Sequence, residues 1–162
     1  NITAGEVYPY EFLAGNCPED KKRDIDYIIS LLDWEKNIDP YYREHYFRPP
    51  VIIESNEQYT EKLIIYDNEY FSARELAIQP GQTVNIKDEA AYGCIIIQGH
   101  GKFGVYDAEA PVMLRYGQPG ADEYFVSENA AKEGVNITNN SKYEPMVILK
   151  HFGPDNLQMP KI

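Results

Sequence analysis

The sequence predicts a mainly β protein built from many short strands, and three observations carry this prediction. Short apolar segments recur at a spacing of about ten residues from Lys62 onward, a spacing typical of sandwiches and barrels. Turn-forming residues separate these segments, as at Pro80-Gly81 and at 99–101, where two glycines flank a histidine. The unbroken apolar run 94–97 is typical of a strand that is buried on both faces. We therefore expect a sheet that is rolled or paired with a second sheet.

Composition limits the classes of function that fit this chain of 162 residues. Its 26 acidic and 15 basic side chains give a formal charge of −11, which disfavours binding to the phosphates of nucleic acids. No run approaches the roughly 18 apolar residues of a membrane span, and no leader-like segment opens the chain, so we expect a cytoplasmic protein with no membrane partner. Two distant cysteines, Cys17 and Cys94, do not indicate a disulfide framework.

The first part of the chain differs from the rest. Asn16 and Glu19 resemble a capping box, and apolar residues at helical spacing follow them, so we predict a helix over 18–32. The segment 34–50 is rich in tyrosine and closes with two prolines, which we interpret as an extended arm that packs over a neighbouring surface. Residues 1–60 are accordingly assigned to a helix and a tyrosine-rich arm packed on a β domain that spans 61–162.

Within that β domain the alternation of apolar segments and turns predicts nine strands. They cover 62–66, 71–78, 82–86, 93–98, 102–106, 112–115, 123–126, 134–138 and 145–151.

Two segments of this region carry a family resemblance. The turn at Ile78–Thr83, followed by an apolar strand that ends in the glycine-rich segment 99–104, resembles the first motif of the cupin superfamily. The segment 134–145, with its strand, asparagine turn and Glu-Pro pair, is similar to the second motif. The resemblance spans about 63–152 and implies a single cupin-type double-stranded β-helix, a jelly-roll-like barrel whose interior is the usual ligand site.

The metal ligands that the resemblance implies are absent from this sequence. Catalytic cupins hold a divalent metal with three histidines and a glutamate; the matching positions here are residues 85–88, Tyr92 and Val135. None of these is the expected ligand, so we expect no metal at that site and no cofactor. A shift of register brings Asp88 or Glu89 into play, and carboxylates there would suit a hard cation.

Alternation along the predicted strands places one phenol and several apolar side chains inside the barrel. These candidate ligand-binding residues are Tyr92, Cys94 and Ile96, with Val135 and Ile137 opposite. Arg74 is added as a candidate anion contact, although an exposed strand residue is the simpler interpretation, and the same holds for Arg115. His45 is a candidate acid–base group if the arm covers the barrel mouth. His100 is interpreted as a turn residue, and His151 as a structural or rim residue.

These observations favour a module that binds a small molecule, with a sugar or sugar phosphate as the ligand class. Aromatic rings can stack on the apolar face of a sugar while polar groups bind its hydroxyls. The lead-in and barrel together weakly resemble the cupin domains of mannose-6-phosphate-isomerase-like proteins. A sugar or sugar-phosphate isomerase or epimerase remains an alternative, as does a structural module for assembly, and a homodimer is left open.

Overall fold

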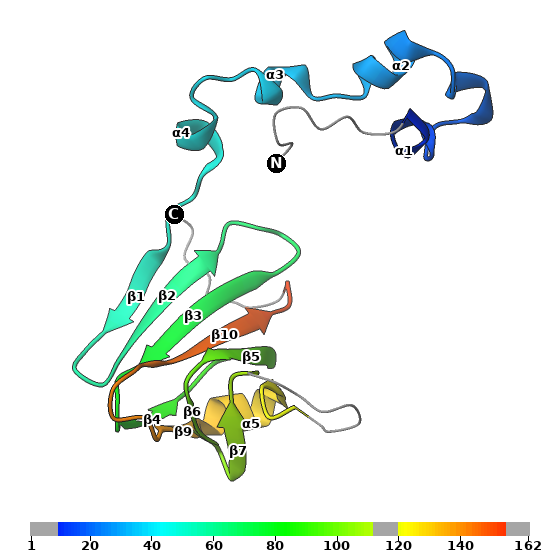
Figure 1. Ribbon diagram of the computed structural model, residues 1–162. Helices are drawn as coiled ribbons and strands as arrows, with labels where there is room; N and C mark the ends of the chain where they lie inside the picture. The colour runs from blue at the N-terminus through cyan, green and yellow to red at the C-terminus, as the bar shows by residue number, and fades with distance from the viewer. Residues whose placement is uncertain (1–9, 112–119, 155–162) are drawn as a thin grey trace. The chain divides into compact units, whose positions relative to one another are not determined.

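The computed structural model describes residues 10–111 and 120–154 of the chain (Figure 1). The chain divides into two compact units, 1–48 and 49–162, and each unit is described by itself. In the described residues no helix is long and apolar enough to cross a membrane. The predicted strand 112–115 and Arg115 lie outside the described residues.

The first unit consists of short helical turns. They are α1 (Tyr10–Ala14), the 3-10 turn η1 (Glu19–Lys21), α2 (Ile25–Ser30), α3 (Trp34–Asn37) and α4 (Tyr42–Tyr46). The helix predicted over 18–32 is therefore wrong in its extent, because Asp24 starts a new helix by accepting a hydrogen bond from the backbone nitrogen of Tyr27 at 2.9 Å. The segment 34–50 is not extended as predicted, since Asp33 caps α3 in the same way.

The second unit contains two antiparallel sheets. The larger one, sheet A, has the order β1 (Val51–Ser55), β2 (Tyr59–Ile65), β3 (Ser72–Ile78), β10 (Met146–Phe152), β5 (Tyr92–Gln98) and β8 (Glu123–Val126). Sheet B has the order β4 (Thr83–Ile86), β9 (Val135–Asn139), β6 (His100–Phe103) and β7 (Tyr106–Glu109). One helix, α5 (Glu128–Glu133), lies between β8 and β9 in the chain.

The strands of this unit pair as the two arms of one long hairpin, so that each pair encloses the next pair in the sequence. β3 pairs with β10, β4 with β9, β5 with β8 and β6 with β7, and the four pairs alternate between sheet A and sheet B. A long hairpin that coils in this way is the double-stranded β-helix of jelly-roll folds, so the predicted fold class is confirmed. The two sheets, however, do not close into a barrel in the described residues, and the fold is better described as a sandwich.

Most of the space between the sheets is filled by apolar side chains. The core includes Leu76, Ile96, Ile137, Met146 and Ile148, each with no exposed surface. Such a filled interior leaves the ends and edges of the sandwich as the places where a ligand can enter.

Three differences from the predicted elements have local causes. The hairpin of β1 and β2 begins before residue 61, and Asn56 stabilises its turn by accepting hydrogen bonds from the backbone of Gln58 and Tyr59. The predicted strand 102–106 is split into β6 and β7 by a turn in which Gly104 has φ +60°. Helix α5 was not predicted; Ser127 caps its first turn.

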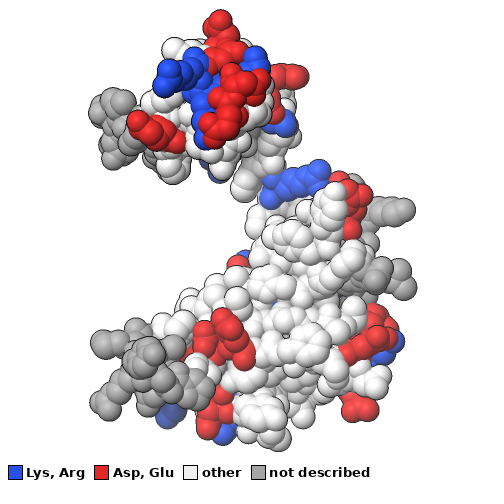
Figure 2. All heavy atoms as spheres, turned by 90° about the vertical axis from the view of Figure 1, so that its right-hand side faces the viewer, with Lys and Arg blue, Asp and Glu red and all other residues white. Residues whose placement is uncertain are grey.

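Charged side chains gather at the margins of the second unit on the side that Figure 2 presents, and they leave a broad uncharged area between them.

Candidate functional site

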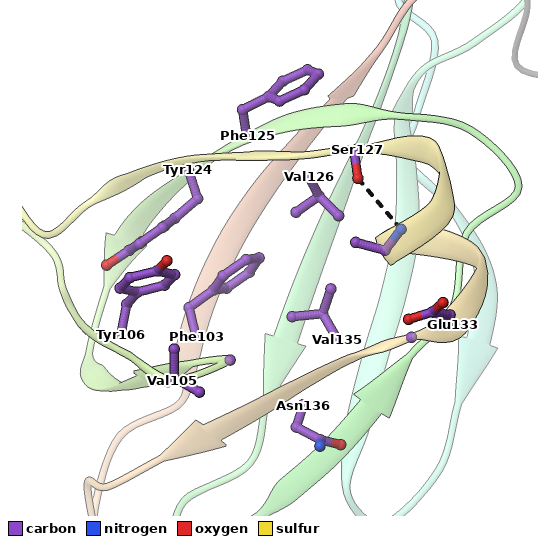
Figure 3. A pocket seen from close by; sticks show the side chains of 13 residues that line it. Phe103, Val105, Tyr106, Tyr124, Phe125, Val126, Ser127, Glu133, Val135 and Asn136 are labelled. Carbon is purple, nitrogen blue, oxygen red and sulfur yellow. Dashed lines mark hydrogen bonds between the residues drawn. The ribbon is translucent and has the colours of Figure 1, made fainter.

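A pocket of about 550 Å³ opens between the edge of sheet A at β8 and the strands of sheet B (Figure 3). It is called the inter-sheet pocket below. Its lining comes from β6 and β7, from β8 and α5, and from the start of β9. The lining residues are Phe103, Gly104, Val105, Tyr106, Tyr124, Phe125, Val126, Ser127, Ala130, Glu133, Gly134, Val135 and Asn136.

One end of the inter-sheet pocket is aromatic. The ring of Tyr124 stacks on Phe103, with centroids 4.8 Å apart and planes at 15°, and faces Tyr106 at 6.3 Å (Figure 3). The Tyr124 hydroxyl shares its single hydrogen between the backbone oxygens of Asp107 and Ala121, which fixes the ring across the gap between the sheets. Partial burial raises the pKa of Tyr124 above its ordinary value. Tyr106 is largely exposed and offers its ring to a ligand.

The other end of the inter-sheet pocket is polar. Ser127 caps α5, Glu133 ends the same helix, and Asn136 follows on β9. The side-chain oxygen of Asn136 accepts a hydrogen bond from Asn85 at 2.8 Å, which holds the amide in place. The lining contains one carboxylate and no Lys or Arg among the described residues. Its electrostatics therefore disfavour an anionic ligand.

A second feature is a cluster of four charged side chains inside the sandwich. Lys150 Nζ lies 2.8 Å from Asp88 Oδ2 and 2.5 Å from Glu61 Oε1. Arg74 approaches the same two carboxylates, at 3.1 Å from Asp88 and 3.6 Å from Glu61. All four residues are buried, and Lys150 has no exposed surface. Two cations and two anions balance one another, as buried charges must.

Sheet A brings this charge cluster together through its register. Lys150 on β10 is the partner of Arg74 on β3 and of Cys94 on β5, so the three side chains form one inward-facing row. In the next row Phe152 pairs with Tyr92, and the Lys150 ammonium lies 5.4 Å from the centroid of the Tyr92 ring.

Burial changes the acid–base behaviour of two β5 side chains beside the charge cluster. Desolvation, together with the nearby Asp88 carboxylate, raises the pKa of Tyr92 far above its ordinary value. Burial also raises the pKa of the Cys94 thiol to about 12, against a smaller opposing effect of Lys150. The Tyr92 hydroxyl has no hydrogen-bond partner in the described part of the chain. Both groups therefore remain neutral at physiological pH.

The structure distributes the predicted ligand-binding residues over different places. Val135 lines the inter-sheet pocket, whereas Ile96 and Ile137 belong to the packed core, with Tyr92 and Cys94. The interpretation of Arg74 as an exposed strand residue is wrong, because β3 turns it inward to the charge cluster. His45 lies in the first unit, where its Nδ1 is 2.6 Å from Asp39 Oδ2 and the Asp39 pKa is lowered by this contact. His100 is exposed on β6, and His151 faces outward on β10.

The two carboxylates proposed for a hard cation have different surroundings. Both oxygens of Asp88 already face cations, one from Arg74 and one from Lys150, so a metal ion would have to displace them. Glu89 follows Asp88 in the connection to β5. In residues 10–111 and 120–154 no three His, Cys, Asp or Glu side chains lie together as a metal site would require.

Most residues of the inter-sheet pocket were not predicted from the sequence, and in the charge cluster Lys150 and Glu61 were not predicted. A signal for Lys150 exists, because it occupies an inward position of the alternating strand 146–152, where every other inward residue is apolar. Glu61 has no such signal, since its strand was predicted to begin after it. The pocket aromatics come from three separate strands, and their meeting depends on how the two sheets stack.

The nested pairing and the inter-sheet pocket define the class of this chain as a double-stranded β-helix with a pocket at its edge. The solved structures similar to this chain include cupins, the family that its sequence motifs resemble. A cupin-2 domain from Rhodospirillum rubrum shares 14% identity over 71% of this chain and 78% of its own, with a TM-score of 0.46.

Two further structures show the range of proteins that resemble the chain. A chain in the crystal structure of Rhodobacter sphaeroides SigE in complex with the anti-sigma ChrR matches with 13% identity and a TM-score of 0.49, over 91% of this chain and 70% of the other. Ectoine synthase from P. lautus matches with 15% identity and a TM-score of 0.46, over 62% and 67%. No family model and no curated protein matches the chain. Activity does not follow from such likenesses, and the resemblance to mannose-6-phosphate-isomerase-like proteins stays a prediction.

Proposed function

We propose that this chain is a small-molecule-binding module whose inter-sheet pocket holds an uncharged sugar. The observation that carries the proposal is the division of the pocket into an aromatic end and a polar end (Figure 3). A pyranose has an apolar face that stacks on an aromatic ring and hydroxyls that bind carboxylate and amide groups.

The aromatic end supplies the stacking surface. Tyr124 is fixed by the hydrogen bond from its hydroxyl to the backbone and by Phe103, so its ring is already ordered before a ligand arrives. Tyr106 is the more exposed of the two tyrosine rings and is accessible to a sugar. Ordering in advance lowers the entropy cost of binding.

The polar end supplies acceptors and donors. Glu133 can accept two hydroxyl hydrogen bonds, and Ser127 and Asn136 are the other polar side chains among the lining residues. Because the described lining has no cation and the chain carries a charge of −11, a free sugar is favoured over a sugar phosphate. The pocket volume of about 550 Å³ is within the range of small-molecule sites.

Calorimetric titration with glucose, galactose, mannose and N-acetylglucosamine, each compared with its 6-phosphate, tests this proposal. We expect heat of binding for at least one free sugar, a weaker response to its phosphate, and loss of binding in Tyr106→Ala. Tyr143→Ala is the matched control, because Tyr143 is also exposed and lies outside the pocket lining. Binding of the phosphates alone, or equal loss in both variants, would contradict the proposal, as would no binding of any sugar.

A further inference from the structure

The outward face of sheet A is mostly apolar, although the solvent face of an antiparallel sheet is ordinarily polar. On β5 the outward residues Ile95 and Ile97 are 37% and 49% exposed. On β10, which lies between β3 and β5, the outward residues Val147 and Leu149 are only partly covered. The surface that these side chains form with the outward residues of β2, β3 and β8 is called the outer face of sheet A. Contiguous apolar surface of this kind is typical of an interaction site.

A hollow of about 450 Å³ lies on this outer face above Gly93. Gly93 has no side chain, and a Cβ placed there would meet nothing within 4 Å. Its cross-strand neighbours are His151 on β10 and Phe125 on β8, so an imidazole and an aromatic ring border the hollow on opposite sides. Phe125 is 76% exposed, and its ring points away from the interior of the inter-sheet pocket (Figure 3). The hollow therefore has an aromatic wall that a ligand can reach.

Glu123 lines the same hollow and supplies the one carboxylate among its described lining residues. It is exposed and lies on the same side of β8 as Phe125, two residues earlier in the chain. In residues 10–111 and 120–154 its carboxylate has neither an ion pair nor a hydrogen-bond partner.

The charge of Glu123 is not balanced by the rest of the outer face. Alternation along β2, β3, β5, β8 and β10 turns two other charged side chains outward, Lys62 and Glu75. These two bind each other at 2.9 Å, so they neutralise one another. The outer side of these five described strands therefore carries one unpaired negative charge, and it lies beside an exposed aromatic ring.

We propose that the hollow above Gly93 receives an arginine side chain of a partner protein. A guanidinium can lie against the ring of Phe125 while its N–H groups donate to the Glu123 carboxylate, because residues two apart on a strand are separated by only about 7 Å. Arginine suits the hollow better than lysine, since its planar and weakly hydrated group both stacks on rings and binds carboxylates through two donors. The chain's net charge of −11 also attracts a basic partner.

The surroundings of the hollow favour a protein partner over a free small cation. Ile97, Val147 and Leu149 extend the apolar surface beyond the hollow. In protein interfaces an arginine or aromatic anchor is typically surrounded by contacts that exclude water, which strengthens a charged contact. A free guanidinium compound would leave its contact with Glu123 open to water, where an ion pair contributes little. The partner's arginine is therefore expected to project from an apolar surface.

Two-dimensional NMR of the 15N-labelled full chain with a short peptide tests this proposal. The probe is an acetylated and amidated pentapeptide whose central arginine is flanked on each side by a leucine and a terminal glycine. Its control carries citrulline, an uncharged isostere, in place of the arginine. We expect the amide shifts of Gly93, Glu123 and His151 to change with a dissociation constant of about 1 mM for the arginine peptide, and the citrulline peptide to bind at least about threefold more weakly.

Two variants locate the binding in the hollow. Glu123→Gln should weaken binding of the arginine peptide at least about threefold and leave that of the citrulline peptide unchanged. Glu109→Gln is its matched control, because Glu109 is also exposed but lies on β7 outside the hollow. Gly93→Val fills the hollow without a clash and should abolish binding of the arginine peptide. Neither Gly93 nor Glu123 lines the inter-sheet pocket, so both variants should keep the heat of sugar binding.

Three outcomes would overturn the proposal. Equal affinity for the two peptides shows that the hollow does not recognise the positive charge. Equal loss in Glu123→Gln and Glu109→Gln shows that only the overall charge of the chain matters. No shift at Gly93 or Glu123 up to about 20 mM peptide shows that the outer face has another occupant, such as a second copy of the chain.

Discussion

Lys150 Nζ lies 2.8 Å from Asp88 Oδ2 in the interior of the sandwich, and neither side chain has exposed surface. Removing the ammonium leaves two buried carboxylates facing one arginine, so we expect Lys150→Met to lower the free energy of unfolding by about 3–5 kcal/mol. Urea unfolding followed by circular dichroism measures this loss. The exposed pair of Lys102 and Asp107, 2.6 Å apart, provides the control, because Lys102→Met should cost less than about 1 kcal/mol.

The same pair gives a second prediction, through a double-mutant cycle. Lys150→Met combined with Asp88→Leu removes one charge of each sign and leaves Arg74 beside Glu61. We expect the double variant to be more stable than the sum of the single losses implies, by at least about 1 kcal/mol. Simple additivity in urea unfolding would show that the two charges do not depend on each other.

Cys94 leads to a prediction about alkaline stability. Its pKa is raised from 9.0 to about 12 by burial, so above pH 9 the unfolded chain loses a thiol proton that the folded chain keeps. Stability is therefore fully present below pH 9 and falls as the pH rises toward 12. Tyr92, whose pKa is also raised, adds to this loss above the ordinary tyrosine range.

The Cys94 effect is measured as the slope of unfolding free energy against pH. We expect Cys94→Ala to have a shallower slope than the wild type between pH 9 and 11, whatever its absolute stability. Iodoacetamide should alkylate Cys94 at pH 9 only after unfolding, since about a thousandth of the native thiol is ionised there against about half in the unfolded chain. Equal slopes together with rapid native alkylation would contradict the burial of this thiol.

Gly101 provides a test of how closely the strands of sheet B approach. A Cβ at Gly101 would lie 1.8 Å from the backbone oxygen of Thr138 on β9, which the backbone cannot accommodate without moving. We expect Gly101→Ala to reduce the melting temperature strongly or to prevent folding, while Gly93→Ala, which meets open space, leaves it within a few degrees. Thermal melts of the two variants decide this, and similar values would show that the approach is looser than described.

Much of the fold could be predicted from the sequence because its strands are encoded locally. The apolar alternation in 145–151 and the turn at Pro80-Gly81 each mark an element without reference to the rest of the chain. The break at Asp24 was missed because the capping-box pattern at Asn16 and Glu19 placed the start of the helix before the apolar stripe, which itself begins only at Ile25. The helix start at Asp33 depends on its side-chain cap, which the apolar spacing does not indicate.

The candidate site was harder to predict because it depends on contacts between distant segments. In the sequence Arg74 resembles an ordinary strand residue, and its burial is explained by two carboxylates, Asp88 from the connection between β4 and β5 and Glu61 from β2. The ring of Tyr124 meets Phe103 because sheets A and B stack, and no spacing in the sequence records that stacking. The resemblance to cupins predicted a ligand site in the interior, whereas packed side chains occupy this part of the sandwich.

Two-dimensional NMR of the 15N-labelled full chain during a titration with free hexoses tests most directly whether the inter-sheet pocket holds an uncharged sugar. We expect the amide shifts of Tyr106, Tyr124 and Asn136 to change, with little change at Lys150 or Tyr143, and we expect Tyr106→Ala to abolish these changes. Changes confined to residues outside the pocket lining, or none with any of the sugars at concentrations of about 50 mM, well above the range of ordinary binding constants, would contradict the sugar proposal.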